Sequence, residues 1–113
     1  MKFKQLARID QSAGLAEHKL TLGNIILKTV ESLDDDFIEK FHQTIGKNVK
    51  KLRERKGYSQ LVLSQTLGYK SVGLISQAEI YHKGQHFNLE HLLKIAHVLE
   101  CHIEDFFQES VGE

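Results

Sequence analysis

The stretch from residue 59 to residue 79 constrains the fold of this chain more than any other. Its sequence predicts two short helices separated by a tight corner. Ser59 is suited to cap the first helix, because its side-chain oxygen can accept a hydrogen bond from an otherwise unpaired backbone N–H. Gly68 is suited to end that helix, because glycine adopts the left-handed conformation at little cost. Ser71 is then the expected cap of the second helix.

Apolar residues in this stretch recur at helical spacing. Leu63 and Leu67 lie four apart in the first predicted helix, and Leu74, Ile75 and Ala78 mark the inner side of the second. Two short helices joined by a glycine-bearing turn form the helix-turn-helix unit, whose second helix can lie in the major groove of DNA. The stretch therefore predicts a DNA-binding module.

The charge of the chain is balanced overall but segregated along the sequence. The 113 residues hold 15 Lys and Arg against 15 Asp and Glu. Residues 40–85 hold nine Lys or Arg against two Glu, a local balance of +7, whereas residues 34–39 and 86–113 are acidic. This positive block coincides with the predicted helix pair and the helix before it, where a phosphate backbone would be met. A merely solvated cationic surface is the alternative interpretation.

Three further helical segments are predicted around the pair. A helix from residue 37 to about residue 56 follows the acidic residues 34–36, whose charge suits a helix N-terminus. Asn88 is expected to cap another helix, and a short helix near residues 103–107 can close the core. The buried positions are expected to be Phe37, Phe41, Ile45, Val49 and Leu52 in the first, Leu89, Leu92, Leu93, Ile95, Ala96 and Leu99 in the next, and Ile103, Phe106 and Phe107 in the last.

The first 33 residues carry the weakest pattern. Leu22, Ile26, Val30 and Leu33 fit a helical stripe, but the same region is also rich enough in β-branched residues to form a strand. The helix is favoured over the strand. Residues 1–36 are predicted to form an N-terminal extension, helical or partly β, and are a candidate dimerisation or partner-binding arm.

Several runs of residues together carry a family likeness. They are residues 45–60, Leu67-Gly68, Ile75-Ser76 with Glu79, residues 88–96 and residues 103–107. In this order they resemble the lambda-repressor-like (Xre/Cro-type) helix-turn-helix family, and the likeness covers residues 41–108. The resemblance implies an all-α domain of five helices, over residues 37–109 here, that binds a double-stranded DNA operator as a homodimer. A transcriptional regulator, and specifically a repressor, is the implied function.

The resemblance also implies roles for individual residues. Ser59 and Gln60 match the start of the second helix, where a Gln and the helix's own N–H groups hold a phosphate. Gln77 is the best base reader, since an amide can contact adenine N6 and N7 together. Arg53 and Glu79 match a pair that ties the first helix to the recognition helix. The complete predicted DNA-binding set is Ser59, Gln60, Lys70, Ser71, Val72, Gly73, Ser76, Gln77, Lys83 and Gln85.

Two groups of residues depart from the family pattern. Val72, Gly73 and Leu74 stand where members with strong base readout carry polar residues, which predicts modest direct readout and more affinity from phosphate contacts. Leu61 and Val62 stand where members commonly carry exposed acidic residues, so we expect another segment to cover them. The N-terminal segment of the same or a partner subunit is the expected cover.

Other kinds of site find little support. His82 and His86 lie four apart, as do His97 and Cys101, but neither pair belongs to a recognised zinc pattern, so surface histidines and a packed thiol are expected. No catalytic pairing or phosphate loop is recognisable, so the sequence predicts neither an enzyme nor a cofactor. The longest apolar run, residues 25–27, is too short to cross a bilayer, and a cytoplasmic location is expected.

The sequence also leaves open a function of another class, the binding of a protein partner. The chain could be the antitoxin of a toxin–antitoxin pair, with residues 1–36 binding the toxin while the core represses its own operon. It could also be a protein-interaction module that uses the same fold without reading DNA. Both alternatives make residues 1–36, or the apolar positions on the helix pair, a surface for a protein partner.

Overall fold

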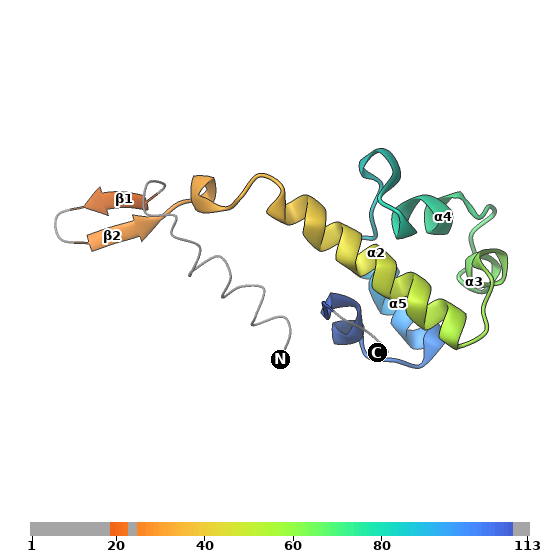
Figure 1. Cartoon of the computed structure of the whole chain (residues 1–113). Helices are drawn as coiled ribbons and strands as arrows, with labels where there is room; N and C mark the ends of the chain where they lie inside the picture. Colours follow the sequence, from red (N-terminus) through yellow and green to blue (C-terminus); the bar gives the residue numbers. More distant parts are fainter. Residues whose placement is uncertain (1–18, 23–24, 110–113) are drawn as a thin grey trace.

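A β-hairpin and four α-helices make up most of the described part of the chain, residues 19–22 and 25–109, in the computed structural model (Figure 1). Three short 3-10 helices lie between and after them. In chain order the elements are β1 (Lys19–Leu22), β2 (Ile25–Lys28), η2 (Val30–Ser32), α2 (Phe37–Arg55), α3 (Gln60–Thr66), α4 (Gly73–Glu79), η3 (His82–Gly84), α5 (Leu89–Leu99) and η4 (Ile103–Phe107).

The helix favoured for the region from residue 20 to residue 33 is wrong, and the alternative of a strand is correct. β1 and β2 pair antiparallel, with Leu20 opposite Leu27 and Leu22 opposite Ile25. Only the two residues 23 and 24, Gly and Asn, separate the strands in sequence, and this dipeptide favours a tight turn over a continuing helix. Figure 1 shows the hairpin beyond the N-terminal end of α2, away from the other helices.

The long helix α2 forms one side of the helical domain. Its 19 residues end one position before the predicted end, and Gly57 follows with a φ of +82°, the left-handed conformation that stops the chain from continuing as a helix. Ile45, Val49 and Leu52 are buried as predicted, whereas Phe41 is only partly buried against the core. The buried apolar residues of α2 therefore lie from the middle of the helix to its C-terminal end.

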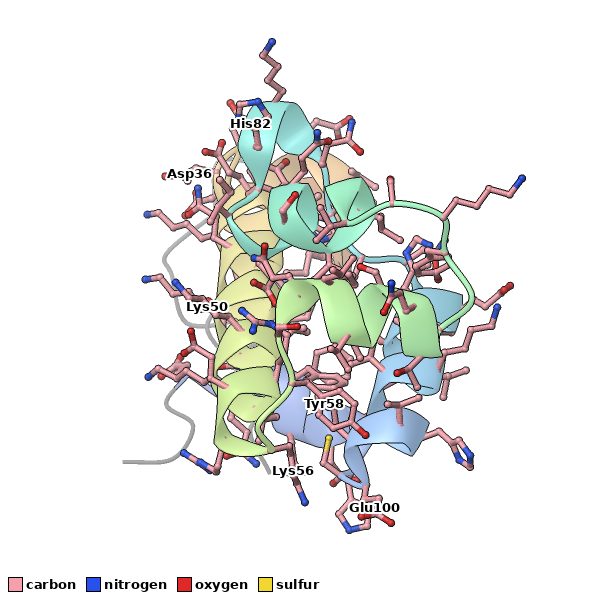
Figure 2. The ribbon with its side chains drawn as sticks, turned by 90° about the vertical axis from the view of Figure 1, so that its right-hand side faces the viewer. Asp36, Lys50, Lys56, Tyr58, His82 and Glu100 are labelled. Atoms are coloured by element: carbon pink, nitrogen blue, oxygen red, sulfur yellow. The ribbon has the colours of Figure 1, made fainter. Side chains whose placement is uncertain are left out.

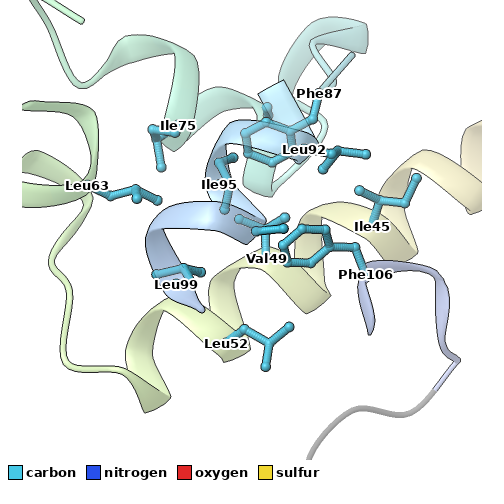
Figure 3. Packing of buried hydrophobic residues seen from close by; sticks show 12 residues of the cluster. Ile45, Val49, Leu52, Leu63, Ile75, Phe87, Leu92, Ile95, Leu99 and Phe106 are labelled. Atoms are coloured by element: carbon cyan, nitrogen blue, oxygen red, sulfur yellow. The ribbon is translucent and has the colours of Figure 1, made fainter. Parts of the chain in front are cut away.

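The core joins α2 to α3, α4, α5 and η4. Figure 3 shows Val49 and Leu52 of α2 in one cluster with side chains from α3, α4, α5 and η4. Each large apolar side chain buried in this way stabilises the fold by about 1.5–3 kcal/mol. The core therefore fixes the positions of the two short helices, which are too short to be stable alone. Its buried members are Ile45, Val49, Leu52, Leu63, Ile75, Ala78, Phe87, Leu92, Ile95, Ala96, Leu99 and Phe106.

The expected fifth helix is present as a 3-10 helix over the predicted residues. Asn48, buried in α2, donates a hydrogen bond from its amide to the carbonyl oxygen of Phe106 at 2.8 Å. The backbone N–H of His102 donates to the carboxylate of Asp105 at 3.0 Å. A segment of five residues closes few helical hydrogen bonds, and short segments of this kind commonly adopt the tighter 3-10 form.

The predicted cap of α5 is confirmed in detail. The side-chain oxygen of Asn88 accepts the backbone N–H of His91 at 2.7 Å, and His91 Nδ1 accepts the backbone N–H of Asn88 at 3.1 Å. The apolar pattern of α5 is only partly inward, however. Leu89 and Leu93, expected in the core, are exposed, because they lie toward one edge of the apolar face of the helix, away from the centre of the buried side chains Leu92, Ile95 and Leu99.

Candidate nucleic-acid interface

The first of the two short helices and the glycine that follows it take the geometry that the sequence predicts. Ser59 caps α3, and its hydroxyl oxygen accepts the backbone N–H of Val62 at 3.0 Å. Gly68 follows α3 with a φ of +87°. Leu63 of α3 and Ile75 of α4 are both fully buried. The unit is thus held together by its own apolar contacts and anchored on the core below it.

The second helix begins one residue later than predicted. Val72 is the residue before α4, and its backbone already has helical angles, φ −83° and ψ −6°. Ser71 is therefore one residue too early to cap the helix, and its hydroxyl oxygen accepts the N–H of Gly73 at 3.4 Å instead. The expectation that Ser71 caps the helix is wrong for this reason.

The outer edge of α4 is accessible. Gln77 is exposed, whereas Ile75 and Ala78 on the other side of the helix are buried. Ser76 is half-buried, and its hydroxyl donates to the carbonyl oxygen of Gly73 at 3.2 Å. Of Ser76 and Gln77, which both belong to the predicted DNA-binding set, Gln77 has the more accessible side chain.

A buried ion pair fixes α4 on α2. Arg53 Nε donates to Glu79 Oε2 at 2.7 Å, and Arg53 Nη2 donates to Glu79 Oε1 at 3.0 Å. The Arg53 side chain is 6% exposed and the Glu79 side chain is 0% exposed. Arg53 Nη1 also donates to the carbonyl oxygen of Tyr58, the residue before the cap of α3, at 2.8 Å. The pair that the family resemblance implies therefore links α2, α3 and α4 at one point.

Gln60 takes part in the same network, which the sequence did not indicate. Its amide Nε2 donates to Glu79 Oε1 at 2.9 Å. One of its two amide N–H bonds is thus used within the protein, and the other can still meet a phosphate. The sequence indicated only a phosphate-binding role for Gln60, because its partner Glu79 lies 19 residues further along the chain.

The positive block of the sequence lies on the surface. Among residues 40–85, all of which the structure describes, eight Lys and Arg are exposed, and the ninth is Arg53, which Glu79 neutralises. Glu54 is the one exposed carboxylate in that range. Figure 2 shows Lys50 on the outer side of α2 and Lys56 at its end, at the edge of the face that carries α3 and α4.

Two exposed lysines lie near the two ends of α4. Lys47 of α2 lines a surface depression together with Gln43, Glu79 and Ile80, at the C-terminal end of α4. Lys70 is exposed in the turn that leads into α4. The helix expected to read DNA therefore has a positive side chain near each of its ends.

The segment after α4 carries Lys83 and Gln85, both exposed. Residues 82–84 form η3, and Figure 2 shows His82 on the same side of the domain as α4. His86 stacks on His42 of α2, with ring centroids 3.9 Å apart. Sequence reasoning missed this contact, because the two histidines are far apart along the chain and no pattern links them.

Other predicted features can be placed briefly. Leu61 and Val62 are 53% and 47% exposed, so no described residue covers them, and the predicted cover by an N-terminal segment stays a prediction. Cys101 is half-buried, and burial raises the pKa of its thiol, which favours the unreactive protonated form. Among the described residues there is no group of three or more His, Cys, Asp or Glu arranged to hold a metal ion.

Comparisons with known proteins identify the family. A helix-turn-helix family model matches residues 49–106, which span the second half of α2 through η4. No curated protein and no solved structure matches the chain. None of the described helices is long and apolar enough to pass through a bilayer. The matched residues include the whole α3–α4 unit and its ion pair, and the chain belongs to the lambda-repressor-like (Xre-type) helix-turn-helix family of DNA-binding regulators.

Proposed function

We propose that the protein is a sequence-specific double-stranded DNA-binding transcriptional regulator that acts as a dimeric repressor in the cytoplasm. The observation that carries this proposal is the exposed edge of α4, centred on Gln77, with the exposed side chains of Lys47 and Lys70 near its two ends. A rigid helix edge with a cationic rim matches the shape and charge of a major groove between two phosphate backbones.

Each part of the surface has a role in this proposal. The amide of Gln77 contacts an adenine edge, and Val72 contacts a thymine methyl group. The N-terminal end of α3, with Ser59 and Gln60, binds one phosphate, and Lys70 binds another. With seven residues, α4 is about 10 Å long and spans only a few base pairs, so one protomer reads a short half-site.

Dimerisation supplies the second half-site. Two protomers related by a two-fold axis place their α4 helices in successive major grooves, about 34–36 Å apart, on a palindromic operator. We assign dimerisation to residues 1–36, whose described part includes β1 and β2. A two-stranded hairpin is marginally stable alone in water, so pairing with the hairpin of a second copy would complete a larger sheet. A bound dimer then represses by blocking access of the transcription machinery to the DNA.

Selection from a random double-stranded oligonucleotide pool tests this function. The full chain is expected to recover two inverted half-sites whose centres are about 10–10.5 base pairs apart. The variant Gln77→Ala is expected to fold normally and to lose the preference at one base pair of each half-site, a loss of about 1–3 kcal/mol in discrimination. Recovery of unrelated sequences by the full chain would contradict sequence-specific binding.

The second function, an antitoxin or a protein-interaction module, is favoured by the exposure of Leu61 and Val62. In that case a protein partner covers the two side chains, and residues 1–36 bind a toxin. A chain that begins at residue 34 separates the two functions in the same selection. If it recovers single half-sites, the extension serves self-assembly. If it still recovers paired half-sites, the extension is free to bind another protein.

A further inference from the structure

Three aromatic rings connect α2 with the segment that follows α4. His42 of α2 lies parallel to His86, with centroids 3.9 Å apart and an interplanar angle of 24°. His42 also faces Tyr81, at 5.9 Å and 12°, and Tyr81 lies 6.3 Å from His86. We call His42, Tyr81 and His86 the ring stack. It joins a rigid helix to both ends of the segment from residue 81 to residue 86.

The segment held by the ring stack has an unfavourable backbone. Tyr81 and Lys83 have φ values of 55° and 51°, in the left-handed region that residues with a Cβ atom seldom adopt. Such conformations persist only where surrounding contacts enforce them. The ring stack is a contact between this segment and α2, so its separation would remove one of the contacts that hold the segment in this conformation.

The ring stack accommodates neutral histidines and disfavours charged ones. His42 Nδ1 is buried and has no hydrogen-bond partner among the described residues, so a proton bound there would become a buried donor without an acceptor from that part of the chain. His86 Nδ1 lies 2.9 Å from the carbonyl oxygen of Gly84, which fixes its proton on that atom. A second proton on each ring would place two positive charges face to face at less than 4 Å between centroids.

The groups around the ring stack do not offset this charge. From the segment after α4, Tyr81 and His86 face His42, and from α5 His91 interacts electrostatically with His86. Glu39, one turn earlier on α2, is exposed and its carboxylate accepts a hydrogen bond from the amide of Gln43 at 3.3 Å, so water screens its negative charge. Lys83, on the segment itself, is exposed and adds a positive charge rather than a negative one.

We propose that the ring stack is an acid-sensitive contact: it holds residues 81–86 against α2 when both histidines are neutral, and it separates when the pair takes up a proton. Burial and the neighbouring His86 both lower the pKa of His42 from its ordinary value of 6.5. A released His42 regains that ordinary pKa and binds protons more readily than the stacked one. Proton uptake therefore favours the released form, and its population rises as the pH falls below 6.5.

The consequence concerns the end of the DNA-reading helix. Tyr81 comes two residues after the last residue of α4, and Lys83 and Gln85 lie on the segment that would be released. Acidification would thus change the conformation next to α4 without unfolding the core. This inference does not depend on DNA binding, because the ring stack and its titration belong to the free protein.

NMR of the full-length protein tests the inference directly. The imidazole signals are followed from about pH 7.5 to about pH 5, together with backbone order parameters for residues 82–86. The titration midpoint of His42 is expected to lie below the ordinary histidine value of 6.5. Over the same pH range the order parameters are expected to fall from about 0.85, typical of rigid backbone, to below about 0.6.

Two variants separate titration from folding. His86→Phe keeps an aromatic ring on His42 but removes one of the two titrating groups, so residues 82–86 should stay ordered at low pH and the midpoint of His42 should rise. His97→Phe, at an exposed position on α5, should behave like the parent protein. The inference fails if the parent segment is as ordered at about pH 5 as at about pH 7.5. It also fails if His86→Phe loses order at the same pH as the parent.

Discussion

The variant Glu79→Ala is expected to lose about 3–5 kcal/mol of unfolding free energy. Its carboxylate is fully buried and accepts two hydrogen bonds from Arg53 and one from Gln60. Removing it leaves the guanidinium of Arg53 buried without its counter-ion, which costs more than the intact pair contributes. Urea denaturation measures the loss, and the melting temperature should fall by on the order of 15 °C.

A matched control uses the exposed ion pair on α5. Lys94 Nζ lies 2.8 Å from Glu90, whose side chain is 73% exposed. Glu90→Ala should change stability by at most about 1 kcal/mol, because water screens this pair. Weaker DNA binding by Glu79→Ala is expected to follow from its lost stability. A Glu79→Ala protein that melts like the parent yet binds DNA poorly would contradict this explanation and indicate a direct role at the interface.

The variant Gly46→Ala is expected to be destabilised by about 3 kcal/mol, the upper end of the usual cost of overpacking. Gly46 lies in α2 where the end of α4 passes closest. An added Cβ would lie 2.6 Å from the carbonyl oxygens of both Ala78 and Glu79. These are backbone atoms, so neither can rotate away, and α4 must shift as a unit. DNA affinity should fall with stability, because the shift moves the edge that carries Gln77.

Gly73→Ala is the matched control, since it adds the same methyl group at another helical glycine. The added Cβ would meet only the hydroxyl oxygen of Ser71, at an ordinary 3.5 Å. Alanine is preferred over glycine in a helix, so stability should rise by about 0.5–1 kcal/mol. Chemical denaturation of both variants provides the comparison. Equal stability of Gly46→Ala and the parent protein would mean that α4 can move away from α2 at Gly46 without loss of stability.

Local signals in the sequence were sufficient to predict the helical domain. Ser59 and Asn88 each cap a helix at the predicted position, because a side-chain acceptor before an apolar repeat acts within a few residues. Gly57 and Gly68 have the positive φ expected of residues that end helices. The accessible position of Gln77 follows from the same periodicity, since it falls opposite the buried residues of α4.

The features that the sequence could not provide depend on contacts between distant segments. The stacking of His42 on His86 and the hydrogen bond from Gln60 to Glu79 join residues that no local pattern relates. The hairpin was missed for a different reason. Its apolar residues fit a helical repeat and a strand almost equally, and only the pairing of one strand with the other decides between them.

The salt dependence of DNA binding tests most directly whether the cationic surface around α4 is a DNA-binding surface. If each protomer neutralises about four phosphates, the log affinity of the dimer for DNA, measured by fluorescence anisotropy, should fall with the log of the salt concentration with a slope of roughly −7. Lys70→Gln should reduce the magnitude of that slope by about 2, one contact per protomer, whereas Lys94→Gln on α5 should leave it unchanged. A steep slope with this difference between the two variants is the expected result. An affinity that stays constant as salt is raised would contradict DNA binding through this surface.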